Sequence, residues 1–510
     1  MDKLNVVAWS LFLMAGFVMS KSIAYGYDSV GGEADKKEFS LVLIGGRVID
    51  PETGLDGVRN VAISKGEIVA VSEHPLLGQQ IVDVSGLVVS PGFVDLHAHS
   101  QMPMGQHFAV FDGVTTSLEL EAGSYPVASL GTHKPFDVDG KALINFGASV
   151  GHLFARDRVF NGQKAAENVV DNVMKKVANN RASLKENLSK NQLSLLEQYL
   201  RNGLDQGGLG IGLSLDYANE AVTPEELRLA FDVAAERNAP IFVHVRRNGP
   251  AGDPSGLIEV LNLAEATGAS LHVVHIAASG INGTAEFMRL VRAANKRGAK
   301  VTMESLPYNT GGTALTADVF DRDWQSIFGV TYEDLELVST GERLTKATFE
   351  HYRKVRPEDF TINYYNREEW TKIATEADDV IIASDSLPMF GLEHKVHPMG
   401  VGTFSRVLGR YVREKGSISL PKAIAKMTLL PAKVLESYSP NMARKGRISV
   451  GADADISIFD ANRIIDNATY REPYQESTGM VHVLVDGEFV IKYGKLQKGV
   501  SPGKRILRGQ

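Results

Sequence analysis

The two ends of the chain share one hydrophobic pattern, in which short β-prone apolar runs alternate with turn residues. Residues 39–90 contain three such stretches broken by Gly-Gly, Pro-Glu-Thr-Gly and Lys-Gly turns, which predicts an antiparallel meander. The same pattern returns at residues 446–460 and 479–499. Because elements of one kind flank a middle of different character, we expect a small β-sandwich built from both termini: residues 39–90 from the N-terminal side and 419–510, after a helical return, from the C-terminal side.

The middle of the chain, residues 91–418, alternates apolar runs with amphipathic helical stretches, as parallel βα units do. Eight runs with intervening helices predict an α/β fold with a closed (β/α)8 TIM barrel. One helix start is explicit, because Thr223, Pro224 and Glu226 have the spacing of an N-cap, a first-turn proline and a capping box. The eight runs are 92–96, 114–120, 142–150, 208–215, 239–245, 270–276, 299–304 and 379–384.

Residues 309–378 form a longer segment than the single helix that a barrel needs before its last strand. We interpret this segment as an insertion over the mouth of the barrel. A lid and a surface subdomain without a catalytic role are both compatible with the sequence.

The first 24 residues have the pattern of a cleaved signal peptide. An apolar run follows Lys3, and Ser22-Ile23-Ala24 supplies small residues at positions −3 and −1. Residues 25–38 are polar and predict a spacer. We therefore expect an exported, periplasmic protein without stable membrane insertion after cleavage. An uncleaved N-terminal membrane anchor is the alternative.

The composition limits the possible partners and metal ligands of the chain. The chain has 510 residues, a formal net charge of −7 and no cysteine. The acidic balance argues against a nucleic-acid partner, and the oligomeric state is left open. Without cysteine, any bound metal must be held by histidine and carboxylate side chains.

The stretch PGFVDLHAHS, residues 91–100, predicts a strand, a turn and a second strand that ends at His97 and His99. Histidines at positions i and i+2 of a strand point to the same side, and two adjacent buried imidazoles favour a divalent metal. Ionisable residues also end other predicted strands. They are Glu119 and Glu121 on strand two, His244 on strand five, His275 on strand six and Asp385 on strand eight.

The carboxyl ends of barrel strands are where catalytic groups gather, so these residues predict a metal site. Nitrogen and oxygen donors without sulfur suit zinc, with manganese, iron or cobalt also possible. Asp385 would accept a proton from the water that a metal activates, which indicates hydrolysis. His272 has the opposite strand parity to His275, so we expect it to face the outer helices.

The chain contains, in order, the motifs PGFVDLHAHS, FDGVTT, VGHLFAR, GIGLSLDYANEAVTPEEL, FVHVR, VVHIAASG, ASDSLP, GTFSRVLGRYVRE, KMTLLPAKVL and KGRISVGADADISIFD. In this order the motifs resemble the amidohydrolase superfamily, and within it the D-aminoacylase (N-acyl-D-amino-acid deacylase) branch. The resemblance covers nearly all of the chain after the leader. It implies His97 and His99 at a first metal position, His244 and His275 at a second, and Asp385 as general base.

Three departures from the branch affect the site. Where the branch has a bridging Cys, this chain has the stretch SLELEAG, so the ligand is assigned to Glu121, which the spacing favours over Glu119. The Lys that often comes soon after the strand-six histidine is absent, because His275 is followed by Ile276-Ala277-Ala278. The Arg that commonly follows the His-Pro pair is replaced by Met399.

The loss of these two cations puts a free carboxylate on the substrate in question. Arg156 and Arg246 are possible replacements. The residues expected to bind substrate are His152, Arg156, Tyr217, Arg246 and Tyr308.

The sequence as a whole predicts an amidohydrolase that holds one or two divalent ions, expected to be Zn²⁺, and acts on a small-molecule substrate with a linear amide bond, such as an N-acyl amino acid. The proposed ligands are His97, His99, Glu121, His244, His275 and Asp385. A dipeptidase or cyclic-amide hydrolase of the same superfamily is the alternative among enzymes, and a catalytically silent periplasmic binding protein is the alternative outside them.

Overall fold

The computed structural model describes residues 38–174, 182–357, 359–393 and 395–509. The predicted leader, residues 1–24, and the predicted spacer apart from its last residue lie outside these ranges. Within them, no helix has both the length and the apolar character required to cross a bilayer.

An eight-stranded parallel sheet forms the centre of the fold, in the order β6-β7-β8-β9-β10-β11-β12-β17. The first and last strands approach each other at a bridge between Ala98 and Ser386, and the Asp385 amide donates to the His97 carbonyl at 2.8 Å. The predicted barrel is therefore confirmed, as a nearly closed one. Its strands, each overlapping its predicted run, are β6 (Phe93–Asp95), β7 (Val114–Ser124), β8 (Asn145–Gly151), β9 (Ile211–Ser214), β10 (Ile241–His244), β11 (Leu271–Val273), β12 (Val301–Ser305) and β17 (Val380–Ile382).

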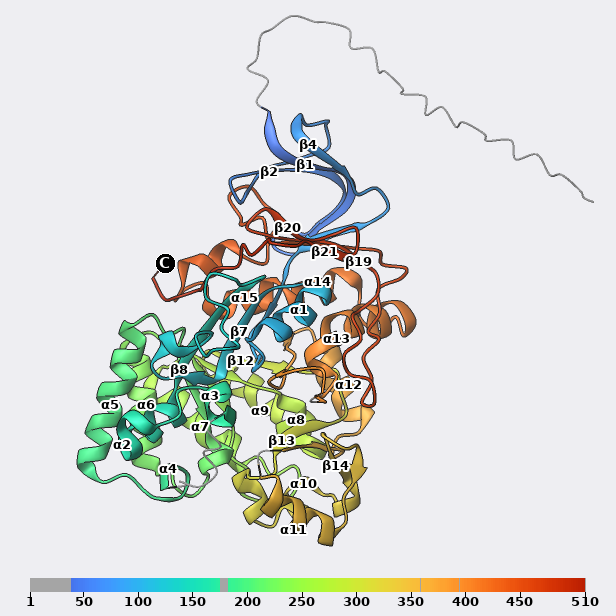
Figure 1. Ribbon diagram of the computed structural model, residues 1–510. Helices are drawn as coiled ribbons and strands as arrows, with labels where there is room; N and C mark the ends of the chain where they lie inside the picture. Colours follow the sequence, from blue (N-terminus) through green and yellow to red (C-terminus); the bar gives the residue numbers. More distant parts are fainter. Residues whose placement is uncertain (1–37, 175–181, 358, 394, 510) are drawn as a thin grey trace, which may run out of the picture. The chain divides into compact units, whose positions relative to one another are not determined.

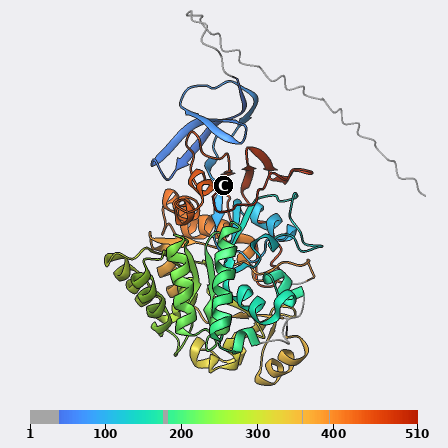
Figure 2. The same cartoon turned by 90° about the vertical axis from the view of Figure 1, so that its left-hand side faces the viewer.

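Helices between these strands pack around the barrel, and the view in Figure 2 shows several of the green ones side by side. They bury apolar faces against the outward-facing residues of the strands, as in the large cluster that joins Leu200, Val233 and Val260 to Ile211 and Val243. The helices are α1 (Pro103–Phe111), α2 (His152–Asn161), α3 (Val169–Met174), α4 (Ala182–Lys185), α5 (Lys190–Asp205), α6 (Pro224–Glu236), α7 (Ser255–Thr267), α8 (Ile276–Gly280), α9 (Thr284–Lys296), α12 (Glu368–Glu376), α13 (Met399–Arg406), α14 (Leu420–Met427) and α15 (Leu429–Leu435).

Helix α6 begins where the sequence places it, but only half of the expected capping box forms. The Thr223 side chain accepts a hydrogen bond from the Glu226 amide at 3.2 Å. The Glu226 carboxylate does not reach back to the cap, because it binds His152 and Arg156 on α2 instead. A local helix signal is thus overridden by a tertiary ion pair.

The two ends of the chain meet in a nine-stranded mixed sheet, as predicted. In Figure 1 the blue N-terminal and red C-terminal strands lie together, and β5 pairs with β18 to join them. Strand β5 continues through Gly92 into β6. A Cβ atom at residue 92 would lie 2.2 Å from Thr115 Oγ1, so this position has room only for glycine. The strands are β1 (Phe39–Asp50), β2 (Leu55–Ser64), β3 (Glu67–Ser72), β4 (Gly78–Asp83), β5 (Val88–Pro91), β18 (Ile456–Phe459), β19 (Met480–Val485), β20 (Glu488–Lys492) and β21 (Lys495–Leu496).

The insertion after β12 is a small subdomain with its own sheet, in the order β13-β16-β14-β15. Its aromatic core includes Phe320, Trp324 and Phe349. Helix α12 lies inside the predicted insertion limits but packs on α9, β12 and β17, so it is the barrel helix before the last strand. The subdomain elements are β13 (Gly311–Ala314), α10 (Trp324–Phe328), β14 (Leu335–Leu337), β15 (Glu342–Arg343), α11 (Lys346–Val355) and β16 (Phe360–Asn363).

Candidate metal centre and active site

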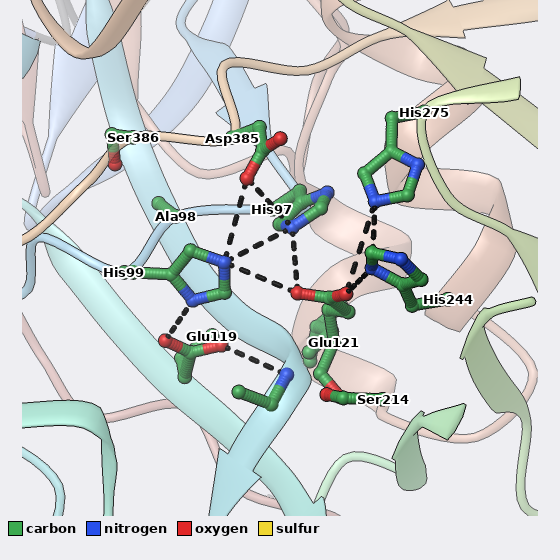
Figure 3. Close-up of polar contacts among 12 residues, drawn as sticks. His97, Ala98, His99, Glu119, Glu121, Ser214, His244, His275, Asp385 and Ser386 are labelled. Atoms are coloured by element: carbon green, nitrogen blue, oxygen red, sulfur yellow. Dashed lines mark hydrogen bonds and ion pairs between the residues drawn. The ribbon is translucent and has the colours of Figure 1, made fainter. Parts of the chain in front are cut away.

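Six predicted ligands from five different strands come together at the carboxyl end of the barrel (Figure 3). They form two trios whose ligand atoms lie within 4.8 Å of one another. The first trio is His97, His99 and Asp385, and the second is Glu121, His244 and His275.

The first trio has its potential metal-binding atoms facing one another. The Nε2 atoms of His97 and His99 are 3.2 Å apart, and Asp385 Oδ1 lies 3.2 Å and 3.5 Å from them. The Nδ1 atom of His97 is 2.6 Å from Glu304, and that of His99 is 2.7 Å from Glu119. A metal-bound imidazole keeps one N–H, so with the outer nitrogens donating to these carboxylates the inner Nε2 atoms are free to bind a cation.

The spacing of the Nε2 atoms suits a divalent cation between them. Glu121 Oε2 completes the group at 3.2 Å from both Nε2 atoms. A tetrahedral zinc ion with ligands about 2.0–2.1 Å away separates its donor atoms by about 3.3 Å. His97, His99, Asp385 and Glu121 therefore fit a tetrahedral divalent ion.

The second trio shares Glu121 with the first. Its Oε1 atom lies 2.6 Å from His244 Nδ1 and 3.8 Å from His275 Nε2, which are themselves 3.1 Å apart. One carboxylate thus turns one oxygen to each trio, which is the arrangement of a bridging ligand. Glu119 instead orients His99 and accepts hydrogen bonds from the Ala122 and Gly123 amides. The geometry therefore favours Glu121 over Glu119 for the bridging position.

Two of the six residues have left-handed backbone conformations, His275 at φ 33° and Asp385 at φ 53°. Such conformations are costly for residues other than glycine and gather at functional sites. His275, with its left-handed backbone, lies two residues beyond the end of β11, so the alternation of side chains along the strand no longer applies. This explains why the prediction for His272 was wrong.

His272 lies beneath the site, not against the outer helices. It is fully buried, and its Nε2 atom is 2.9 Å from Glu304 Oε2. Glu304, on β12, therefore connects His272 to His97. We did not identify Glu304 from the sequence, although a lone carboxylate in an otherwise apolar strand is itself a signal for a buried partner.

The electrostatics of the site are those of ionised carboxylates among imidazoles. Burial would raise the pKa of Glu121, but hydrogen bonds from His244, His275, His97 and His99 hold it well below its usual value. For Asp385 too, burial is outweighed, mainly by the charge of His97, and its pKa is lowered. Both groups are therefore available as anionic ligands or proton acceptors at neutral pH.

A cavity of about 270 Å³ opens onto the centre. His99, Glu121, His244, His275 and Asp385 line it. The Asp385 side chain is 17% exposed, more than any of the other five candidate ligands. The insertion lines another wall of the cavity, which excludes a subdomain remote from the site. Its lining residues include Gly311, Gly312, Thr313, Ala314, Thr316, Ala317, Phe328, Phe360, Asn363 and Tyr365.

Of the five predicted substrate-binding residues, only Tyr217 lines the cavity. Its ring lies edge-on to His244 at 5.4 Å, and its hydroxyl accepts a hydrogen bond from Thr313 at 3.3 Å. This placement keeps Tyr217 beside the second trio.

The structure does not place the other four at the cavity. Arg156 is fully buried between α2 and α6, where it binds Glu226 and the Ser183 carbonyl, and His152 binds the same Glu226 at 2.9 Å. Arg246 binds the Asn219 and Val222 carbonyls and pairs with Glu259, and Tyr308 packs under Arg406. Residue type and motif position gave no information on which side of the chain these groups face.

The cation that does line the cavity is Arg247, the neighbour of Arg246. It follows β10 by three residues, and its Nη1 atom lies 2.9 Å from His244 Nε2. The doubled arginine was visible in the sequence, but only the end of β10 decides which of the two faces the site.

Comparisons with known proteins agree with this geometry. A model of the amidohydrolase family matches residues 369–491. N-acyl-D-glutamate deacylase from Alcaligenes xylosoxydans xylosoxydans is 29% identical over 93% of this chain and 97% of the relative, and D-aminoacylase from the same organism is 26% identical over 89% and 95%.

The solved structure of N-acyl-D-glutamate deacylase from Bordetella bronchiseptica, in complex with zinc and a phosphonate inhibitor, has the same fold. It superposes with a TM-score of 0.75 at 24% identity and covers 92% of this chain and all of that one. The paired trios, the barrel and these relatives together place the chain in the amidohydrolase superfamily, as a metal-dependent hydrolase related to the D-aminoacylases.

Proposed function

We propose that this protein hydrolyses linear amide bonds, with N-acyl amino acids as its substrate class, at a binuclear divalent metal centre. The observation that carries the proposal is the shared carboxylate of Glu121, which turns one oxygen to each of two ligand trios at the floor of one cavity. Zinc fits the nitrogen and oxygen donor set best.

A bound divalent metal would lower the pKa of a water molecule and polarise the amide carbonyl. Asp385 lies beside the first trio and faces the cavity, so its carboxylate accepts the proton of the attacking water and returns it to the leaving nitrogen. Glu304 and Glu119 hold His97 and His99 in the tautomer whose Nε2 atom is free to bind the metal.

Metal analysis combined with a substrate screen tests this proposal. We expect about two divalent ions per chain, and release of carboxylate from N-acyl-D- or N-acyl-L-amino acids. Glu121→Ala removes the shared ligand, so both ions and the activity should be lost together. Glu286→Ala, on the exposed face of α9, is a control for handling. Full activity with a single ion in the Glu121→Ala variant would contradict the binuclear assignment.

Cyclic-amide hydrolysis and dipeptide hydrolysis are the alternatives within the superfamily. The bridging position here belongs to Glu121 of β7, and β9, Ile211–Ser214, contains no lysine that could be carboxylated to bridge two ions. This favours linear amides. Dihydroorotate, hydantoin and dipeptides belong in the same screen, and turnover of any of them above the N-acyl amino acids would replace the proposed substrate class. A protein that binds metal but turns over none of these compounds would support the silent binding protein.

We further propose that the protein is exported and that its leader ends at Ala24, because Ser22-Ile23-Ala24 follows an apolar run. Mass spectrometry of the protein from its native host should then find Tyr25 at the N-terminus. An intact Met1 in the membrane fraction would indicate an anchor.

A further inference from the structure

Arg247 is the one cationic side chain that lines the cavity among the residues that the structure describes. It is 9% exposed and lies next to the second trio through its contact with His244. A permanent positive charge in this place faces whatever molecule enters the cavity.

The hydrogen bonds of Arg247 leave part of its guanidinium unused. Nη1 donates to Asp216 at 2.7 Å and lies 2.9 Å from His244 Nε2, and Nη2 donates to the Ala278 carbonyl at 3.3 Å. The guanidinium has five N–H groups, and the buried Nε–H has no partner in the described part of the chain. Arg247 therefore keeps hydrogen-bonding capacity that the described residues do not use, and because it lines the cavity, a ligand there can supply the acceptor.

The charge of Arg247 is not cancelled by its neighbour. Asp216 contacts two arginines, Arg247 and Arg322, each at 2.7 Å. Arg322 also lies 3.3 Å from Asp318, which Lys185 contacts as well. Asp216 divides one negative charge between two guanidinium groups, so Arg247 can also pair with an anion in the cavity.

Two tyrosines on the same wall of the cavity can help to bind an anion. Tyr217 and Tyr365 both line the cavity. Burial raises the pKa of Tyr365 to about 12 and raises that of Tyr217 further, so both hydroxyls remain protonated and can donate hydrogen bonds. Apolar side chains around them offer room for an uncharged substituent. These include Leu153, Phe154, Phe328, Phe360 and Leu387.

We propose that Arg247 binds a carboxylate of the substrate through its free N–H edge and thereby makes the enzyme selective for acidic amides. This inference rests on the proposed function and names its substrate more closely. The carboxylate belongs either to the amino acid that leaves or to the acyl group, and the two sources can be separated by experiment.

Steady-state kinetics of the metal-loaded protein and its Arg247→Met variant tests the proposal. The probes are N-acetyl-leucine as D and L forms, N-acetyl-leucinamide, which lacks the carboxylate, and N-succinyl-isobutylamine, which carries it on the acyl side. For the carboxylate substrate, kcat/KM should fall about 10- to 100-fold, mainly through KM, as expected for one charge-assisted hydrogen-bonding group. The carboxamide should change less than about threefold.

Arg322→Met is the matched control, because it removes the other guanidinium from Asp216 without changing a cavity-lining residue. It should keep the discrimination between carboxylate and carboxamide. Arg247→Lys should restore part of it, since lysine keeps the charge but not the planar fork. Metal content is measured for every variant, so that disturbance of His244 is recognised.

The outcomes separate this inference from the proposed function. If the Arg247 dependence is found with N-acetyl-leucine, the carboxylate is on the leaving amino acid, and if with the succinyl amide, it is on the acyl group. An equal effect on the charged and uncharged substrates, or none on either, overturns the proposal. If the wild type hydrolyses none of the probes, calorimetric binding of N-acetyl-leucine to the metal-loaded Asp385→Asn protein, with and without Arg247→Met, still decides it.

Discussion

Two buried clusters of ionisable side chains lie at the carboxyl end of the barrel, and they differ in how their charges are satisfied. In the cluster of α2 and α6, the guanidinium of Arg156 meets the carboxylate of Glu226, and His152 shares the same carboxylate. In the metal centre, imidazole nitrogens face one another at 3.2 Å and 3.1 Å.

The contrast separates structure from function. A cluster that contains its own cation is complete and holds two helices together. In the metal centre several ligand atoms converge in a way that suits an added cation, and the opening into a cavity makes this position accessible to substrate. Burial and ionisability alone therefore do not identify an active site, whereas the convergence of several metal-binding atoms on one cavity does.

The largest expected effect is at Asp385. Asp385→Asn keeps the shape but cannot accept a proton, so kcat should fall about 10²- to 10⁴-fold while metal content stays near that of the wild type. Kinetics and metal analysis on the same preparation check this. Retention of most of the turnover would refute the role of general base, and loss of both metal and activity would make Asp385 chiefly a ligand.

The complementary variant is Arg156→Met, in the self-contained cluster. Removal of one partner leaves Glu226 buried without its cation, which typically costs about 3–5 kcal/mol of stability. We expect an earlier urea midpoint but an unchanged kcat and KM per folded molecule. A specific rise in KM for acidic substrates would show instead that Arg156 reaches the substrate.

The stability difference between the wild type and Arg156→Met should depend on pH, because it comes from the ionised Glu226. Burial would raise the pKa of Glu226, but the hydrogen bond from His152 and the charges of His152 and Arg156 lower it. Its stabilising effect is thus present above the unfolded pKa of about 4.3 and lost as the pH falls through the folded value. Without Arg156 the folded pKa rises, so the stability difference between wild type and variant should shrink from pH 7 to pH 4. A difference independent of pH would exclude Glu226 as its source.

A smaller effect is expected at Glu304, which touches the centre only through His97. Glu304→Gln weakens the hydrogen bond that fixes the His97 tautomer, and such outer partners typically contribute about 10- to 100-fold in metal affinity. Competition with a zinc chelator measures this. Unchanged affinity for both ions would show that His97 is oriented without Glu304.

The smallest expected effect is at Tyr217. Tyr217→Phe removes one neutral hydroxyl from the cavity, and a hydrogen bond of this kind contributes about 1 kcal/mol, or roughly fivefold in KM. Metal content and stability should be unaffected. A large fall in kcat would place Tyr217 in the chemical step rather than in binding.

Much of this molecule follows from the sequence alone. The apolar runs locate all eight barrel strands, because a strand buried on both faces must be apolar along its length. The position of an ionisable residue at the end of such a run is equally local, which is why His97, His99, Glu121, His244, His275 and Asp385 could be selected without coordinates.

Only the tertiary structure decided which way side chains face once a strand has ended. The left-handed turn at His275 ended the strand alternation from which the orientation of His272 was predicted. The end of β10 likewise placed Arg247, and not Arg246, at the cavity. Glu226 on α6 binds His152 and Arg156 on α2, and these contacts hold both side chains away from the cavity. Strand periodicity is a short-range property that the sequence encodes directly, whereas the partner of a buried charge is set by segments far apart in the chain.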